Sequence, residues 1–218
     1  MKLPILAGPL RGRWWLPQSR GKILRILGGT YEPEQTRLFR DHIPVGATVF
    51  DVGAHVGYYT LLASVLAGDA GRVWAFEPNP ANHAFLRRHV ALNRRDNVSI
   101  ENAAVSDRNG TASFAFGTGS GTGHLDTNGS LEVRTVRLDD FCREHGVRPG
   151  FLKIDVEGAE LDVLRGAEET ITGRPVIFLS THGARIHAAC LAWLGERGYS
   201  LQPVDAADLD TASEVFCT

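Results

Sequence analysis

The chain has 218 residues, of which 43% are hydrophobic, and a formal net charge of −2. This length suits one sizeable core and is short for two ordinary domains, and the composition is typical of a globular protein rather than a disordered one. The balanced charge provides no basic field for nucleic acid, and no apolar run in the sequence is long enough to span a bilayer. We therefore expect neither a nucleic-acid partner nor a membrane partner.

The three cysteines, Cys142, Cys190 and Cys217, lie far apart and lack the paired spacing of metal ligands. This pattern favours a reducing compartment over a disulfide framework or a cysteine zinc site. Prolines and a glycine interrupt the first ten residues, which argues against a signal peptide. We therefore expect a cytoplasmic protein, and we leave open whether it forms an oligomer.

Residues 1–30 are rich in proline, glycine and arginine, which predicts an irregular arm with one helical turn near residues 22–27. Trp14 and Trp15 in this arm could cover a substrate, but packing against the core or a second subunit is favoured, because paired tryptophans bury a large apolar area. Tyr31-Glu32-Pro33-Glu34 opens a short helix. We expect residues 1–45 to form an arm and helix packed on the core, and residues 46–218 to form the main domain.

Strands and helices then alternate along the chain. We expect strands at 48–51, 72–77, 98–101, 151–155 and 175–179, and helices at 58–66, 80–93, 138–145, 159–165 and about 186–194. Residues 102–136 break this alternation and predict a β-hairpin insertion, whose glycine-rich segment 117–129 could act as a lid. Short strands are expected at 199–203 and 214–217. The alternation predicts an α/β fold, with a mostly parallel sheet, helices on both faces and an antiparallel strand at the end of the sheet.

The segment Asp51-Val52-Gly53-Ala54-His55-Val56-Gly57 joins a predicted strand to a predicted helix. Gly53 permits a tight turn, and Gly57 permits a close approach of the helix to a ligand or the sheet. The helix that starts at Tyr58 offers unpaired N–H groups to a carboxylate or phosphate. A dinucleotide site has glycines two and five residues after the first residue of its motif, whereas here Gly53 and Gly57 lie two and six residues after Asp51, an acid that ends the strand. This pattern better suits S-adenosylmethionine, although an ordinary strand–helix turn would also account for it.

Glu77 ends the second predicted strand, about twenty residues after Gly57. An acidic residue there can accept both hydroxyl hydrogens of a ribose. Alone, Glu77 would be interpreted as a solvated carboxylate before a helix. Its order and spacing relative to the glycine turn instead favour cofactor binding.

Asp155, Glu157 and Glu160 follow the fourth predicted strand, at the edge of the sheet where such folds bind ligands. Three carboxylates within six residues could position a substrate, act as a general base or bind a metal ion, whereas Glu157 and Glu160 could simply cap a helix. Capping is the favoured interpretation for Glu160. His182 follows the fifth predicted strand, where it could take a proton near neutral pH or serve a structural role.

These segments together resemble the FkbM-type family of S-adenosylmethionine-dependent methyltransferases, over nearly the whole chain. The matching motifs are Tyr31–Glu34, Asp51–Thr60, Ala75–Pro78, Asn102–Gly110, Val136–Asp140, Lys153–Glu160, Leu164–Ala167 and Pro175–Gly183. The resemblance implies a Rossmann-like methyltransferase fold in residues 46–218. It also implies O-methylation of a small molecule or a sugar, in natural-product or polysaccharide biosynthesis.

By position, the resemblance assigns the methionine portion of the cofactor to Asp51, Gly53, Ala54 and Gly57, the ribose to Glu77, and the adenine to Ala104 and Ser106. His55 and Pro78 lie inside the same motifs and are counted with the cofactor-binding residues. Asp155 would border the methyl-transfer site, and Glu32 and Ser180 are assigned to the substrate. The family usually has Asn at the position of His55. It often has Glu at the position of Ser180, and if that Glu binds substrate or metal, this function is altered or lost in this chain.

The expected reaction is in-line methyl transfer to an acceptor oxygen, in which alignment of the reactants supplies much of the catalysis. His182, Asp155 or Glu157 would act at the acceptor, with His182 and Asp155 as the candidate bases. A divalent metal held by Asp155, Glu157 or His182 could instead lower the pKa of the acceptor, and the sequence does not decide between these routes. Two further hypotheses stay open: a nicotinamide-dependent oxidoreductase and a non-catalytic cofactor-binding module on the same fold.

Overall fold

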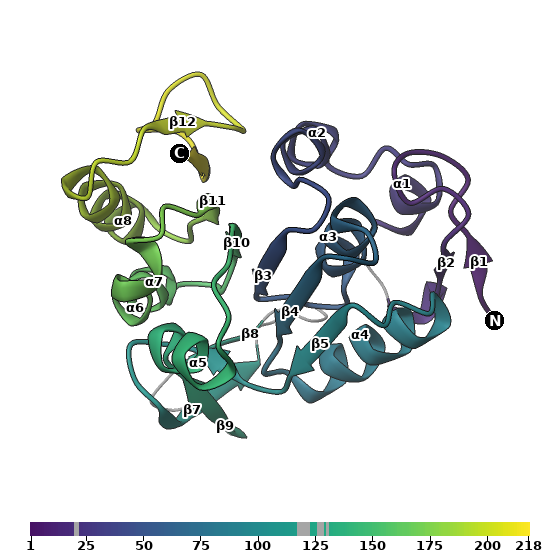
Figure 1. Cartoon of the computed structure of the whole chain (residues 1–218), viewed down its shortest axis with the longest axis horizontal. Coiled ribbons are helices and arrows are strands. Elements are labelled where there is room, and N and C mark those ends of the chain that lie inside the picture. The colour runs from purple at the N-terminus through teal and green to yellow at the C-terminus, as the bar shows by residue number, and fades with distance from the viewer. Residues whose placement is uncertain (20–21, 117–122, 126–128, 130) are drawn as a thin grey trace. The chain divides into compact units, whose positions relative to one another are not determined.

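The computed structural model describes residues 1–19, 22–116, 123–125, 129 and 131–218. Contacts divide the chain into two compact units, residues 1–102 and residues 103–218, and each is described by itself (Figure 1). The boundary expected between residues 45 and 46 stays a prediction, and the whole of the predicted arm lies in the first unit.

The first unit is built on three parallel strands, β3 (Thr48–Val52), β4 (Arg72–Phe76) and β5 (Val98–Glu101), in that order. Helix α3 (Tyr58–Ala67) connects the first pair and α4 (Pro80–Leu92) the second. Both crossovers step in the same direction, so right-handed connections place both helices on one face of the strands. Buried Leu61 of α3, Ala75 of β4 and Leu86 of α4 accordingly share one core cluster.

The sequence signals that bound α4 are confirmed. Asn79 precedes the helix in an extended conformation, and its side chain accepts the backbone N–H of Ala81 at 3.0 Å. Pro80 occupies the first helical position, where a missing N–H costs nothing. This cap fixes where α4 starts relative to Glu77, at the end of β4.

The N-terminal arm is more ordered than its sequence predicts. Strands β1 (Leu3–Pro4) and β2 (Trp14–Trp15) pair antiparallel, and η1 (Pro17–Ser19), α1 (Ile23–Leu27) and α2 (Pro33–His42) follow. The side chain of Asn93 exchanges hydrogen bonds with the backbone of Trp14, and Trp15 is fully buried and stacks on His89 at a centroid distance of 3.9 Å. Packing against the core is therefore the role of Trp15.

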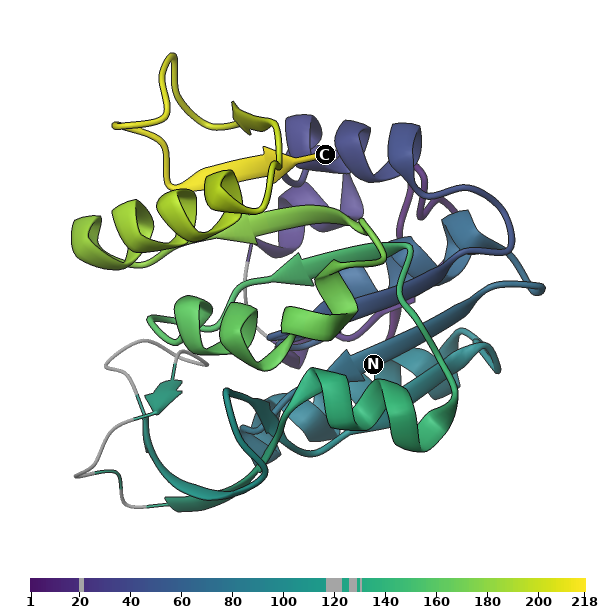
Figure 2. The same cartoon turned by 60° about the vertical axis from the view of Figure 1, so that its left-hand side comes forward.

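The second unit contains a sheet in the order β12 (Leu201–Pro203), β13 (Glu214–Cys217), β11 (Val176–Ser180) and β10 (Phe151–Ile154). Strands β10 and β11 are parallel, and β13 and β12 add antiparallel, as expected for the tail. Helices α6 (Glu160–Gly166) and α8 (Ala184–Glu196) follow β10 and β11 and lie against each other (Figure 2).

The predicted β-hairpin insertion is part of a four-stranded sheet. Strands β7 (Gly110–Phe116) and β9 (Leu131–Val136) pair antiparallel, β8 (Gly123–Leu125) joins β7, and β6 (Ala104–Val105) joins β9 in parallel. Most of the segment 117–129, which we consider a candidate lid, lies outside the described residues.

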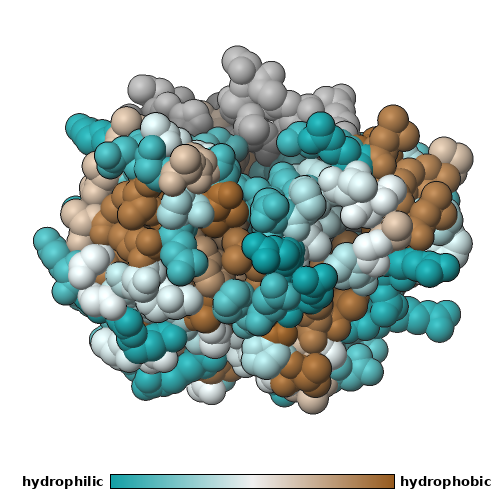
Figure 3. Space-filling model, turned by 90° about the horizontal axis from the view of Figure 1, so that it is seen from above, coloured by the Kyte–Doolittle hydropathy of each residue, from teal (hydrophilic) through white to brown (hydrophobic). Residues whose placement is uncertain are grey.

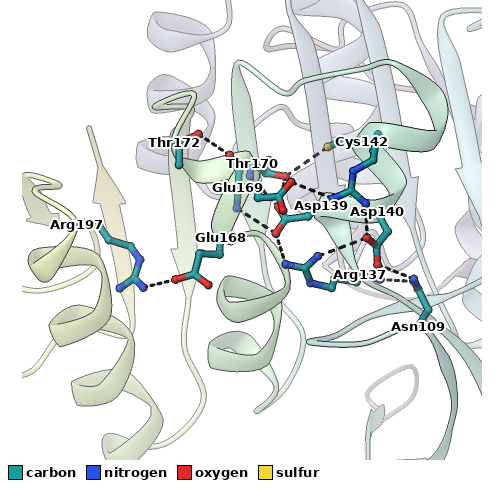
Figure 4. Close-up of polar contacts among 11 residues, drawn as sticks. Asn109, Arg137, Asp139, Asp140, Cys142, Glu168, Glu169, Thr170, Thr172 and Arg197 are labelled. Carbon is teal, nitrogen blue, oxygen red and sulfur yellow. Dashed lines mark hydrogen bonds and ion pairs between the residues drawn. The ribbon is translucent and has the colours of Figure 1, made fainter.

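Asp139, the first acidic residue after β9, has a structural role in the second unit. Asp139 lies in α5 (Leu138–His145) and is fully buried, and its carboxylate accepts the backbone N–H groups of Glu169 and Thr170 at 3.0 and 2.8 Å (Figure 4). It thereby satisfies the first turn of α7 (Glu168–Ile171). Arg137 pairs with the same carboxylate at 2.6 Å, so the Val136–Asp140 motif is explained by packing between α5 and α7.

Candidate active site

The glycine turn of the first unit is tight at Gly53, as its sequence predicts, whereas Gly57 makes its close approach to helix α4 rather than to the sheet. Asp51 is 1% exposed at the end of β3, and its Oδ2 accepts the hydroxyl of Thr60 at 2.5 Å. Gly53 and Gly57 have φ values of +78° and +97°, which glycine adopts readily. A Cβ on Gly57 would lie 2.6 Å from Leu86 Cδ1. The turn therefore needs glycine both for its backbone angle and for its close packing on α4.

Glu77 holds this turn closed from the end of β4. Its side chain is nearly buried, Oε2 accepts the backbone N–H of His55 at 2.7 Å, and Oε1 accepts that of Asn79 at 2.9 Å. The N–H groups of Gly53 and Ala54 both bond to the carbonyl of Phe76. One carboxylate thus joins the turn after β3 to the turn after β4. Pro78 follows it, half-buried, and its carbonyl accepts the side-chain amide of Asn102 at 3.3 Å.

His55 has a φ of +50°, in the left-handed region. Among residues other than glycine, Asn, Asp and His are several-fold enriched there. A change from Asn to His is therefore compatible with the backbone. The contact that the turn makes with Glu77 goes through the backbone N–H of residue 55, which either side chain leaves in place.

Glu32 also lies beside this turn. It precedes α2 with a φ of +42°, and its carboxylate accepts the hydroxyl of Tyr59, the second residue of α3. Of the predicted site residues, those of the first unit therefore form one group: Glu32, Asp51, Gly53, Ala54, His55, Gly57, Glu77 and Pro78.

Ala104 and Ser106 belong to the second unit and are buried. Ser106 follows β6, and its N–H bonds to the carbonyl of Val136. Its own carbonyl lies against Gly166, where a Cβ would be 2.1 Å from the oxygen. The backbone at Ser106 is therefore fixed on both sides.

Asp155 leaves β10 at the edge where Ser180 ends β11, because Ile154 and Leu179 are register partners. Its Oδ2 lies 3.5 Å from Nζ of Lys153, whose side chain is 2% exposed. Glu157 has a φ of +56° and Gly158 one of +107°, so the chain turns sharply between the strand and α6. These features keep two carboxylates, each 36–40% exposed, at one end of the parallel pair.

His182 joins this acidic group from the loop after β11. Its Nε2 lies 3.6 Å from Glu157 Oε2 and 3.9 Å from Asp155 Oδ1, while its Nδ1 lies 2.7 Å from Glu160 Oε1. The hydrogen bond to Glu160 is the main cause that raises the pKa of His182, and the charges of Glu157 and Asp155 act in the same direction, against the effect of burial. The structure thus brings together all three residues that the sequence predicts to be catalytic.

Glu160 is the residue whose role the sequence did not reveal. Ala159 precedes α6 without a side-chain cap, and of the two predicted capping residues only Glu160 accepts a backbone N–H at this end of the helix, that of Gly158. Glu160 is also fully buried beneath His182. The only sequence signal is that Glu160 and His182 both follow strands that a parallel sheet places side by side.

Ser180 is half-buried, and its register partner is Glu214 at the start of β13. Directly paired residues on antiparallel strands share one face of a sheet. The carboxylate of Glu214 therefore lies on the neighbouring strand, opposite Ser180, the position at which family members often have Glu.

Among the residues that the structure describes, no group of three or more His, Cys, Asp or Glu side chains is arranged to hold a metal ion. Within the same residues, every helix is too short or too polar to cross a membrane.

Residues 51–201 match the model of the methyltransferase FkbM domain, which is more than half of the chain. The chain belongs to the FkbM methyltransferase family. The hexuronic acid methyltransferase AglP of Haloferax volcanii is 29% identical, with 76% of this chain and 68% of AglP covered. The 2-O-methyltransferase NoeI of Sinorhizobium fredii is 31% identical (49% and 52% covered), and the 31-O-demethyl-FK506 methyltransferase FkbM of Streptomyces tacrolimicus is 32% identical (57% and 60% covered). The chain thus spans between about half and two thirds of the length of these relatives.

Solved structures show the same fold. The methyltransferase FkbM from Methylobacillus flagellatus superposes with a TM-score of 0.58 at 18% identity, over 79% of this chain and 43% of that chain. Aeropyrum pernix fibrillarin, solved with S-adenosylmethionine, gives 0.55 at 14% identity, over 84% and 73%. The family and the Rossmann-like fold identify the FkbM domain of this chain as that of an enzyme, a methyltransferase that uses S-adenosylmethionine. The predictions of family, fold, enzyme class and cofactor are confirmed.

Proposed function

We propose that this FkbM-family chain transfers a methyl group to a hydroxyl oxygen of a sugar or another small molecule. The names of AglP, NoeI and FkbM, which specify a hexuronic acid, a 2-O position and a 31-O position, support this class of acceptor. The observation that carries the cofactor part of the proposal is the clamp between Glu77 and the glycine turn. The free cysteines suit a reducing compartment, so we retain the cytoplasm as the proposed location.

The residues of the first unit fit the cofactor chemically. The N-terminal end of α3 offers backbone N–H groups, which suit the carboxylate of a methionine moiety, and the turn at Gly53 and Gly57 fixes where that helix begins. The fixed carboxylate of Glu77 suits the two hydroxyls of a ribose. We propose these roles together with Asp51, Ala54, His55 and Pro78, and we propose that Ala104 and Ser106 lie along the adenine.

When bound, S-adenosylmethionine supplies an electrophilic methyl carbon. The acceptor oxygen must lose its proton, and His182 is the proposed base because it is held by Glu160 and lies beside two carboxylates. Asp155 and Glu157 would then bind hydroxyls of the acceptor and stabilise the charged ring. Glu32 and Ser180 are proposed to contact the acceptor.

The cofactor roles are tested by titration calorimetry. We expect the full chain to bind S-adenosylhomocysteine but not NAD, and we expect Asp51→Ala and Glu77→Ala to weaken binding at least tenfold, the equivalent of losing about 1.4 kcal/mol. Glu34→Ala, which removes a carboxylate that is 66% exposed, is the control and should bind normally. Binding of NAD instead would favour the oxidoreductase, and methyl transfer to no acceptor by a chain that binds the cofactor would favour the non-catalytic module.

Glu77 also holds the turn, so its ribose contact needs a separate measurement. An analogue of S-adenosylhomocysteine that lacks both ribose hydroxyls removes the contact from the ligand side. If Glu77 binds those hydroxyls, Glu77→Ala should weaken binding of the analogue much less than binding of S-adenosylhomocysteine. Equal losses for both ligands would show that Glu77 acts only through the turn.

A further inference from the structure

Glu160 places a buried carboxyl group at the beginning of α6. Its side chain has no exposed surface, Oε1 accepts the backbone N–H of Gly158 at 3.0 Å, and the same oxygen lies 2.7 Å from Nδ1 of His182. Oε2 is buried and has no hydrogen-bond partner in the described part of the chain. A buried carboxylate is costly unless it is paired. His182 is therefore the partner on which this carboxylate depends.

The bond to Glu160 decides which nitrogen of His182 carries hydrogen. An ionised carboxylate only accepts hydrogen bonds, so beside an ionised Glu160 the Nδ1 atom donates and the neutral ring has its lone pair on Nε2. Nε2 lies 3.6 and 3.9 Å from the carboxylates of Glu157 and Asp155, beyond hydrogen-bond distance, and the ring is 35% exposed. One edge of the ring is fixed inside the protein, and the other faces partly exposed groups.

Two other histidines show what a purely structural role looks like in this chain. His89 bonds to the carbonyl of Val56 and the N–H of Leu16, and His187 bonds to the hydroxyl of Thr181 and the carbonyl of Leu209. Both rings are buried, and both of their nitrogens are used within the fold. His182 differs because a buried carboxylate holds only one of its nitrogens.

We propose that Glu160 is a positioning residue, which fixes the His182 ring with its Nε2 lone pair directed to the acceptor hydroxyl. The proposal rests on the function proposed above. The proton of the acceptor O–H passes to Nε2, so that both ring nitrogens carry hydrogen and the ring becomes positive. Glu160 then faces an imidazolium at 2.7 Å, and Glu157 and Asp155 face its other edge. Lys153, at 3.5 Å from Asp155, offsets part of that negative charge. The same carboxylate thus orients the base and stabilises its charged form.

Two substitutions separate these effects. Glu160→Gln keeps an acceptor oxygen but removes the charge, so the Nδ1–H tautomer should persist while the acid limb of the pH profile of kcat/KM moves to lower pH. Glu160→Met removes the acceptor, so the tautomer preference should be lost and kcat should fall by about 10²- to 10⁴-fold, the range of a general base. KM for S-adenosylmethionine should change little. The tautomer is read from the ¹⁵N chemical shifts of the His182 ring in the full chain.

Glu157→Gln is the matched control, because it alters a carboxylate at the opposite edge of the ring and should leave the tautomer unchanged. Calorimetry with S-adenosylhomocysteine establishes that each variant is folded. A wild-type ring with its hydrogen on Nε2, or a Glu160→Met variant with unchanged tautomer and kcat, would overturn the inference. If Glu160→Met does not fold, the inference is overturned when the acid limb of the pH profile is unshifted in Glu160→Gln. Failure of the wild-type chain to methylate any acceptor overturns the proposed function instead, whatever the ring tautomer.

Discussion

Gly166 ends helix α6 against the backbone of Ser106. A Cβ at this position would lie 2.1 Å from the Ser106 carbonyl oxygen and 3.0 Å from its carbon, and backbone atoms cannot rotate away. We expect Gly166→Ala to lower the free energy of unfolding by about 2 kcal/mol or more, as overpacking of a tight site does. Urea unfolding of the full chain, followed by circular dichroism, measures this loss.

Gly195 in α8 provides the matched control in the same unit. A Cβ there would have no neighbour within 4 Å, so Gly195→Ala should raise stability by about 0.5 to 1 kcal/mol through helix propensity. Both glycines lie in helices and receive the same substitution, so the opposite signs would arise from packing. A Gly166→Ala variant as stable as Gly195→Ala would contradict the close approach to Ser106.

At the residue scale, the sequence predicts the cofactor motifs better than the acid–base group. Glycine spacing and the position of Glu77 after a strand are local signals, and the clamp between Glu77 and residue 55 agrees with them. The contact between Glu160 and His182 joins residues 22 positions apart. Only the parallel pairing of β10 and β11 brings them together, so nothing local in the sequence links these two polar residues.

At the scale of elements, His89 joins three segments of the first unit. Its Nδ1 donates to the carbonyl of Val56 after the glycine turn, its Nε2 accepts the N–H of Leu16 in the arm, and its ring stacks on Trp15. Burial lowers the pKa of His89 to about 4, although the bond to Val56 acts in the opposite direction. The neutral ring is thus part of the fold, and protonation would break the bond with Leu16.

The pKa of His89 predicts how stability depends on pH. The unfolded chain has an ordinary histidine pKa of 6.5, so between pH 6.5 and about 4 it binds more protons at this site than the folded chain does. Stability should therefore fall as the pH falls through this window, by at most about 3 kcal/mol from this residue. Urea unfolding at several pH values measures the slope.

His89→Gln removes the titration and serves as the comparison. The variant should be less stable than the wild type at pH 7, because the stack and the paired bonds are weakened, but its stability should change less between pH 6.5 and 4. Parallel pH curves for the two proteins would contradict the assignment. Direct titration of the His89 ring by nuclear magnetic resonance should give a midpoint well below 6.

The elements that sequence predicts well are those with strong local signals. Strand β5 and helix α5 have the expected bounds, because periodicity and a closing Gly146 define them. The pairs β1–β2 and β6–β9 are not predicted, because each contains a strand of two residues, which is too short for a periodic pattern in the sequence. Helix α7 has only four residues, and the buried carboxylate of Asp139, from another helix, caps it (Figure 4).

At the scale of the whole chain, the balanced charge provides no strong overall field that would select a charged partner. The net charge is −2, and brown hydrophobic surface alternates with teal hydrophilic surface on the face shown in Figure 3.

The free cysteines provide a chain-wide prediction about reactivity. Burial raises the pKa of both Cys190 and Cys217 to about 12 and also raises that of the half-buried Cys142. At pH 8, a thiol with a pKa near 12 is ionised in only about one molecule in ten thousand, and the thiolate is the nucleophile. We expect iodoacetamide to modify Cys142 slowly but before the other two cysteines, and to leave Cys190 and Cys217 unmodified until the protein unfolds.

Mass spectrometry of the native and the urea-unfolded chain, treated with the same amount of iodoacetamide for the same time, checks the order of modification. Rapid modification of Cys190 or Cys217 in the native chain would contradict their burial, because a thiol without exposed surface reacts only when its surroundings open.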